Sequence, residues 1–179
     1  DDGFLAVLDY VKAGKVQLTF VPLTGYGSVQ NGQGAANAAL CVGLQDKFWE
    51  FHDALFSWQG LYVNQAYTQN RIVAGLENLG VNRDTWNQCI GGSYPGELMT
   101  SASNAAKLQN VQGTPTLIIN GSPASSFDRA TVVQLIEDAI AGVSSTGAGT
   151  DGATVTEVPP TATLEPTAIV LPTMTATPS

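Results

Sequence analysis

Two cysteines and one histidine are the residues of this sequence best suited to nucleophilic or redox chemistry. Cys41 and Cys89 form no C-x-x-C motif, so they build neither a local zinc site nor a local redox dithiol. They are either two separate buried thiols or one disulfide between two helices. The even count and the acidic, lysine-poor composition favour a structural disulfide in an oxidising compartment, worth about 4 kcal/mol through loop closure.

The single histidine lies in a segment of aromatic residues. His52 has Phe48 four positions before it and Phe56 four positions after it, which places the three on one helical face. No second histidine or cluster of carboxylates stands at ligand spacing, so no metal site is expected. A Cys–His nucleophilic pair would need a free thiolate, which a disulfide removes. We therefore expect His52 to be a partly buried, packed side chain.

The segment from Val111 to Gly121 combines a strand signal with a proline. The apolar, partly β-branched run Thr116–Ile119 predicts a buried strand that ends at the turn Asn120-Gly121. Pro115 directly precedes that run and cannot donate a ladder hydrogen bond. Taken alone, this proline could block pairing at the edge of a sheet or mark the end of a loop, with a trans peptide bond as the default.

Composition excludes several classes of function. The chain of 179 residues carries a net charge of −8 and only seven Lys and Arg, with no basic patch for nucleic acid. No apolar run approaches the ~20 residues of a membrane helix. No phosphate-binding loop or hydrolase motif is present, and no cofactor is expected. The hydrophobic fraction of 44% is enough for a folded core.

The elements that must position these residues alternate between helices and strands. Apolar periodicity and capping signals predict helices that fill most of residues 1–142. The expected helices are 1–13, 35–44, 46–58, 65–79, 82–90, 95–108 and 129–141, and the expected strands are 15–21, 116–119 and 124–127. The order indicates an α/β fold with a helical insertion over about 33–109.

The two ends of the chain differ from its folded part. Residues 143–179 are rich in Thr and Pro, which predicts a disordered tail, either a stalk or a segment without a role. At the other end, the chain starts at Asp1 without a methionine, inside a predicted helix. We expect an upstream part to be missing from this sequence, together with any targeting signal.

Several segments taken in order carry a resemblance to a known family. They are Tyr10–Val16, Ala36–Cys41, Gln45–Trp49, His52–Phe56, Gly80–Cys89, Gly113–Thr116 and Asn120–Gly121. Together they resemble the DsbA-like thioredoxin family over about residues 4–141. The resemblance implies a thioredoxin-like fold with a helical insertion, incomplete at its N-terminus. It also implies that Cys41 and Cys89 pair as a second, structural disulfide.

The resemblance implies a site of which this sequence holds only a part. The family's catalytic C-x-x-C would lie upstream of Asp1, so no catalytic residue is expected in this chain. Gly113, Thr114 and Pro115 match the family's cis-proline loop, in which Thr114 presents backbone groups to a substrate and Pro115 packs beside the dithiol. The strand before the missing motif would separate residues 16–21 from residues 116–119, so these two segments should not pair directly.

The resemblance implies a thiol–disulfide oxidoreductase of exported proteins as the parent protein, with this chain inactive by itself for lack of C-x-x-C. Its partners would be protein thiols or disulfides and a redox partner protein, in an extracytoplasmic location. The alternatives are a non-catalytic thioredoxin-like binding module at the cell surface and a purely structural surface domain. The residues upstream of Asp1 would discriminate the enzyme from the module.

Overall fold

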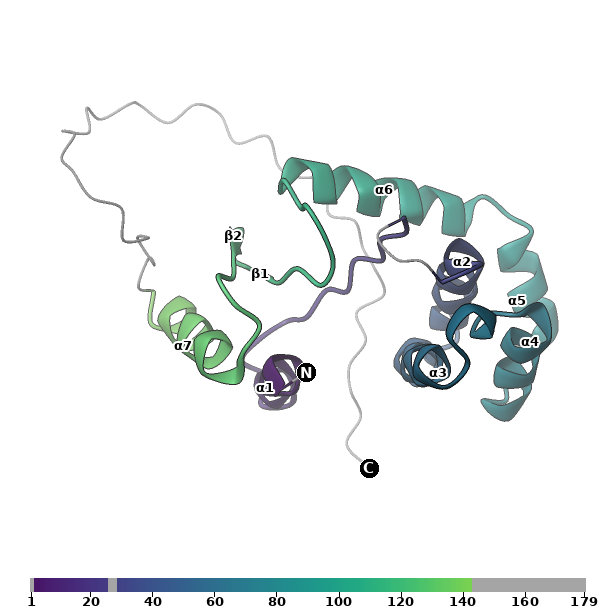
Figure 1. The fold of residues 1–179 in the computed structure, drawn as a ribbon, viewed down its shortest axis with the longest axis horizontal. Helices are drawn as coiled ribbons and strands as arrows, with labels where there is room; N and C mark the ends of the chain where they lie inside the picture. Colours follow the sequence, from purple (N-terminus) through teal and green to yellow (C-terminus); the bar gives the residue numbers. More distant parts are fainter. Residues whose placement is uncertain (1, 26–28, 143–179) are drawn as a thin grey trace. The chain divides into compact units, whose positions relative to one another are not determined.

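The computed structural model describes residues 2–25 and 29–142 of the chain. These residues form two compact units, each with its own apolar core. We call residues 19–115 the helical unit, and residues 2–18 with 116–142 the two-helix unit (Figure 1). The Thr/Pro-rich tail predicted for residues 143–179 lies outside the described residues.

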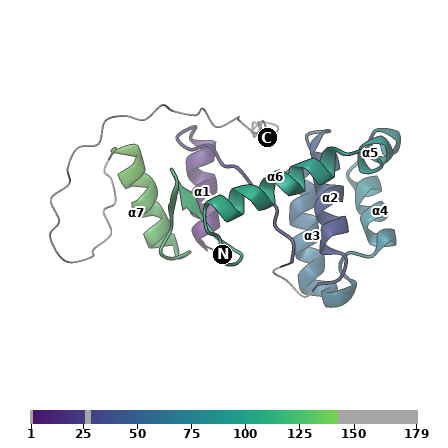
Figure 2. The same ribbon diagram turned by 90° about the horizontal axis from the view of Figure 1, so that it is seen from above.

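The helical unit is built around one central helix. Its elements are α2 (Gly32–Gly43), α3 (Phe48–Tyr62), the short 3-10 helix η1 (Val63–Gln65), α4 (Gln69–Asn78), α5 (Arg83–Ile90) and α6 (Tyr94–Leu108). Helix α2 contacts α3, α4, α5 and α6, so its small apolar residues form the middle of the core (Figure 2). Phe51, Ile72 and Leu76 are the largest of the almost completely buried side chains in this core.

Local sequence signals explain where several of these helices begin and end. The Asn82 side chain accepts a hydrogen bond from the Thr85 N–H at 2.9 Å and caps α5. Gly80 takes a positive φ of 63° after α4, a conformation that glycine adopts without a steric penalty. Asp46, the first residue of the helix expected over 46–58, instead has φ 58° and lies in the turn before α3, so the expected start of this helix was wrong.

The two-helix unit pairs the first and last described helices. Helices α1 (Asp2–Lys12) and α7 (Arg129–Ile140) pack side by side through Ala6, Val7, Val132 and Ile136. Two polar contacts join the same helices: the Tyr10 hydroxyl donates to Glu137, and Arg129 pairs with Asp9 at 3.1 Å.

A glycine allows α1 to approach the segment before α7. A Cβ at Gly3 would collide with the backbone carbonyl oxygen of Phe127. Because that oxygen belongs to the backbone, no side-chain rotation can relieve the contact. Gly3 is therefore required for the observed packing within the two-helix unit.

The sheet of the described residues is a hairpin in the two-helix unit. Strands β1 (Ile118–Ile119) and β2 (Ser122–Pro123) are antiparallel and joined at Asn120-Gly121, the turn that the sequence predicted. The ladder continues with a hydrogen bond from the Ala124 N–H to the Leu117 carbonyl at 2.8 Å. Both strands are shorter than expected, and β2 lies before the predicted range 124–127.

Residues 15–21 were expected to be a strand, and the structure gives them no regular secondary structure. Val16 and Leu18 still pack against the same apolar cluster as Leu117 and Ile119. The described sheet consists of β1 and β2, and residues 16–18 are not a strand of it. The alternating pattern therefore predicted the buried face correctly, but the segment has no ladder partner among the described residues.

Candidate functional site: the cis-proline loop and the cavity beside α6

The loop of Gly113, Thr114 and Pro115 follows the end of α6. The turn after α6 is closed by a hydrogen bond from the Val111 N–H to the Ala106 carbonyl at 2.9 Å, with Asn110 at φ 52°. The Gln112 side chain donates to the side-chain oxygen of Asn110 at 2.9 Å and braces this turn. The chain therefore leaves α6 in a defined direction and enters the loop Gly113–Pro115.

The loop itself is open to solvent. The Thr114–Pro115 peptide bond is cis, and both residues are exposed, while Gly113 is half-buried. Backbone N–H and C=O groups are the groups that an extended polypeptide needs for pairing, and Thr114 carries one of each. The functional role of Gly113, Thr114 and Pro115 stays a prediction at this point.

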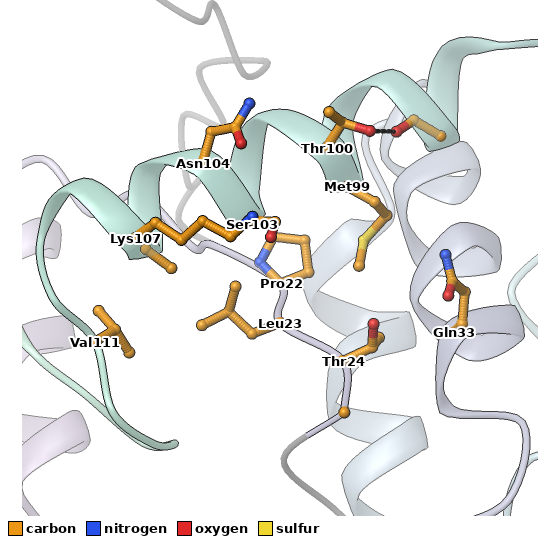
Figure 3. A pocket seen from close by; sticks show the side chains of 13 residues that line it. Pro22, Leu23, Thr24, Gln33, Met99, Thr100, Ser103, Asn104, Lys107 and Val111 are labelled. Atoms are coloured by element: carbon orange, nitrogen blue, oxygen red, sulfur yellow. Dashed lines mark hydrogen bonds between the residues drawn. The ribbon is translucent and has the colours of Figure 1, made fainter.

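A cavity lies in the helical unit, along one face of α6. Its volume is about 490 Å³, within the usual range of small-molecule and peptide sites. Pro22, Leu23 and Thr24 form one wall, and α6 forms the opposite wall (Figure 3). Val111, three positions before Thr114, lies at its edge.

Four polar side chains of α6 line this cavity at helical spacing. They are Thr100, Ser103, Asn104 and Lys107, at positions i, i+3, i+4 and i+7 of the helix, a spacing that places them on one side of α6 (Figure 3). The Thr100 hydroxyl already donates to the Gly96 carbonyl at 2.9 Å. Sequence reasoning missed this group, although the polar residues at spacing i, i+3, i+4, i+7 were a signal that could have found it.

The charges around the cavity are one-sided. Lys107 is a basic residue in the last turn of α6, and the described residues that line the cavity include no Asp or Glu. No ion pair between Lys107 and a described carboxylate is present within 4.0 Å. The cavity therefore offers hydrogen-bond donors and one positive charge within a strongly acidic chain.

The two cysteines lie in the core of the helical unit. Cys41 on α2 and Cys89 on α5 form a disulfide with a Cα–Cα distance of 5.7 Å, which links the two helices. Their exposed fractions are 0% and 8%, so neither sulfur is accessible to a substrate thiol. The pair is a structural link, and the described residues hold no free cysteine.

His52 sits within a cluster of aromatic rings in the helical unit. Its ring lies 5.0 Å from that of Phe20 and 4.7 Å from that of Phe56, centroid to centroid, and its side chain is 13% exposed. Nδ1 is 3.0 Å from the carboxylate of Asp53. This matches the predicted packed histidine. Within the described part of the chain, no three His, Cys, Asp or Glu side chains are placed to hold a metal ion.

Comparison with known proteins identifies the family. The profile of the family described as thioredoxin matches residues 5–138. The chain belongs to the thioredoxin family. This agrees with the α/β thioredoxin-like fold and with the DsbA-like resemblance of the sequence.

Two curated proteins from bacilli are similar to this chain. Both are called "Probable disulfide bond formation protein D". The one from Bacillus cereus is 25% identical over 123 residues, and the one from Bacillus anthracis is 27% identical over 125 residues. Each match covers 67% of this chain and 57% of the relative, so the chain spans little more than half the length of these relatives. No solved structure gives a significant match.

None of the helices in the described part of the chain combines the length and the apolar character that a membrane crossing needs.

Proposed function

We propose that the protein is a thiol–disulfide oxidoreductase that acts on exported proteins. The observation that carries the proposal is the thioredoxin match over residues 5–138, together with relatives named for disulfide bond formation. The low charge content and the buried disulfide are consistent with an extracytoplasmic location, which we include in the proposal.

The reactive dithiol of the proposed enzyme is not the pair Cys41 and Cys89. Both sulfurs are buried and bonded to each other, and the exchange reaction needs an accessible thiolate. The family resemblance implies a C-x-x-C motif upstream of Asp1. We therefore propose that residues outside the printed sequence supply the dithiol, and that this chain contributes the substrate-binding surface.

The proposed chemistry is thiol–disulfide exchange. A thiolate of the reactive dithiol attacks one sulfur of a substrate disulfide, and the other substrate sulfur leaves as a thiolate. The second thiol of the dithiol then attacks the mixed disulfide, so two electrons pass to the substrate and the dithiol becomes a disulfide. The reverse sequence oxidises a substrate dithiol. A redox partner protein would restore the starting state in either direction.

The loop Gly113–Pro115 is the proposed contact with the substrate chain. Thr114 is an exposed residue, and we propose that its N–H and C=O groups pair with an extended polypeptide in the way that a strand adds to a sheet edge. Backbone pairing of this kind tolerates many side chains, which suits an enzyme that acts on varied exported proteins.

Insulin reduction and oxidative refolding of a reduced protein test the proposal. The natural protein, including any residues that precede Asp1, should catalyse at least one reaction, and Cys→Ser variants of its C-x-x-C should abolish the catalysis. The chain of residues 1–179 alone should be inactive. A natural protein without exchange activity would contradict the enzyme, and binding of unfolded polypeptides without exchange would support a non-catalytic binding module.

A further inference from the structure

The polar face of α6 gives the cavity in the helical unit a chemical preference. Ser103 and Lys107, four positions apart on α6, border the same space opposite Pro22 and Leu23 (Figure 3). Ser103 and Lys107 supply a hydroxyl and an ammonium group as hydrogen-bond donors, whereas the Asn104 amide points away from Pro22 and Leu23 (Figure 3). A carboxylate has two oxygens that accept several hydrogen bonds, and bonds to a charged donor are the stronger ones.

We propose that this cavity is a receptor for a carboxylate group of a bound polypeptide, with Lys107 as its charged contact. The proposal rests on the proposed function, because it names a class of substrate for the same protein. The carboxylate could belong to an acidic side chain or to a C-terminus. The apolar wall of Pro22 and Leu23 would take the neighbouring part of the polypeptide.

Three observations carry this assignment. The described lining has no Asp or Glu, although the chain has 15 acidic residues and only seven basic ones. Lys107 forms no ion pair with a described carboxylate. The cavity is also about 490 Å³, enough for a side chain with adjoining backbone.

The net charge of −8 does not prevent the binding of an acid at this place. At physiological ionic strength the Debye length is about 8 Å, so a ligand in the cavity interacts mainly with the charges that line it. Lys107 is the one charged residue among the described residues that line the cavity. Distant carboxylates therefore slow the approach of an acidic ligand more than they weaken the final contact.

A lysine at position 107 has a second possible role, which the experiment must distinguish from carboxylate binding. A lysine in the last turn of a helix also interacts favourably with the partial negative charge at the helix C-terminus. Lys12 has the same place in α1 and is likewise exposed, but it does not line the cavity. Lys12 is therefore the matched control for total charge and for helix-end stabilisation.

The test measures the dissociation constants of three cysteine-free peptides for the natural protein, including any residues that precede Asp1. All are acetylated and equal in length. One has an internal Glu and an amidated C-terminus, one has no acid and a free C-terminus, and one has no acid and an amidated C-terminus. We expect at least one acidic peptide to bind roughly threefold to tenfold more tightly than the neutral peptide. Comparison of the two peptides that carry a carboxylate shows whether an acidic side chain or a C-terminus is preferred.

Substitutions assign the preference to the cavity. Lys107→Met should remove the discrimination between acidic and neutral peptides, and Lys107→Glu should reverse it, whereas Lys12→Met should leave it unchanged. Raising the salt concentration should weaken the preference of the wild-type chain. Because Lys107 is exposed, these variants should fold, which circular dichroism can verify.

Some results would overturn the proposal. These are equal binding of the three peptides, no binding of any peptide, or an equal effect of Lys12→Met and Lys107→Met. Exchange activity is measured separately on the natural protein. Activity without acid discrimination would reject the carboxylate receptor alone, and acid discrimination without exchange activity would reject the proposed enzyme alone.

Discussion

The helical unit and the two-helix unit differ in how much each buries within itself. The core of the helical unit gathers residues from all five of its α-helices and contains the disulfide. The apolar core of the two-helix unit has four buried hydrophobic residues among those described, namely Ala6, Val7, Val132 and Ile136. Burial of apolar surface is the dominant stabilising term, so the helical unit should be the more stable of the two.

The two units also differ in how firmly their elements are held together. The helical unit has the features of a rigid scaffold, with a disulfide between α2 and α5 and a central helix that contacts four others. The two-helix unit holds a short hairpin and two helices joined by a thin core. The following predictions test whether this contrast holds in measured stability.

The largest expected effect comes from removal of the disulfide. The double substitution Cys41→Ala with Cys89→Ala should lower the free energy of unfolding of the helical unit by about 4 kcal/mol, because the bond closes a loop with a sequence separation of 48. Residue-resolved hydrogen exchange can measure the change in each unit. The wild-type chain treated with a reductant should show a similar loss. Equal loss of protection in both units would contradict the contrast between them.

An intermediate effect is expected from the same substitution made once in each core. Ile72 and Ile136 are each 2% exposed, the first in the helical unit and the second in the two-helix unit. Ile72→Ala should cost about 4 kcal/mol, and Ile136→Ala about 2 kcal/mol, because the thinner core can collapse further around the cavity. Denaturant unfolding followed by hydrogen exchange separates the two values. Equal costs, or a larger cost for Ile136, would show that the two-helix unit is the better packed.

Local signals in the sequence predicted much of this fold. Apolar spacing located the helices, and the caps at Asn82 and Asp128 are hydrogen-bonded as such caps should be. Each of these features depends only on residues within a few positions of one another. The strand predicted for residues 15–21 was wrong because a strand needs a partner that is distant in sequence, and no local pattern supplies one.

The candidate site was predictable only in part. Pro115 and the turn after it stand out in the sequence, since proline before a core strand is unusual. The cavity beside α6 does not, because Ser103, Asn104 and Lys107 look like an ordinary solvated helix face. Only the tertiary structure places the segment of Pro22 and Leu23 opposite that face, so the space between them cannot be predicted from α6 alone.

The smallest expected effect concerns the cap of α7 in the two-helix unit. Hydrogen bonds from Ser126, and then from the backbone and side chain of Thr131, lower the pKa of Asp128 from its ordinary value of 3.8 to about 2. Because the folded-state pKa is depressed, the stability contributed by this carboxylate is complete above about pH 4. It is lost as the pH falls from about 4 to about 2.

Asp128→Asn tests this linkage in the thinner unit. The amide can still accept the bond from the Thr131 N–H, but it carries no charge, so the variant should be less stable than wild type at pH 7 and should approach it near pH 2. Urea unfolding between pH 2 and pH 7 measures this convergence. Asp84→Asn, in the first turn of α5, is the charge-matched control in the helical unit. A constant difference between Asp128→Asn and wild type over that range would show that hydrogen-bond geometry, and not charge, carries the cap.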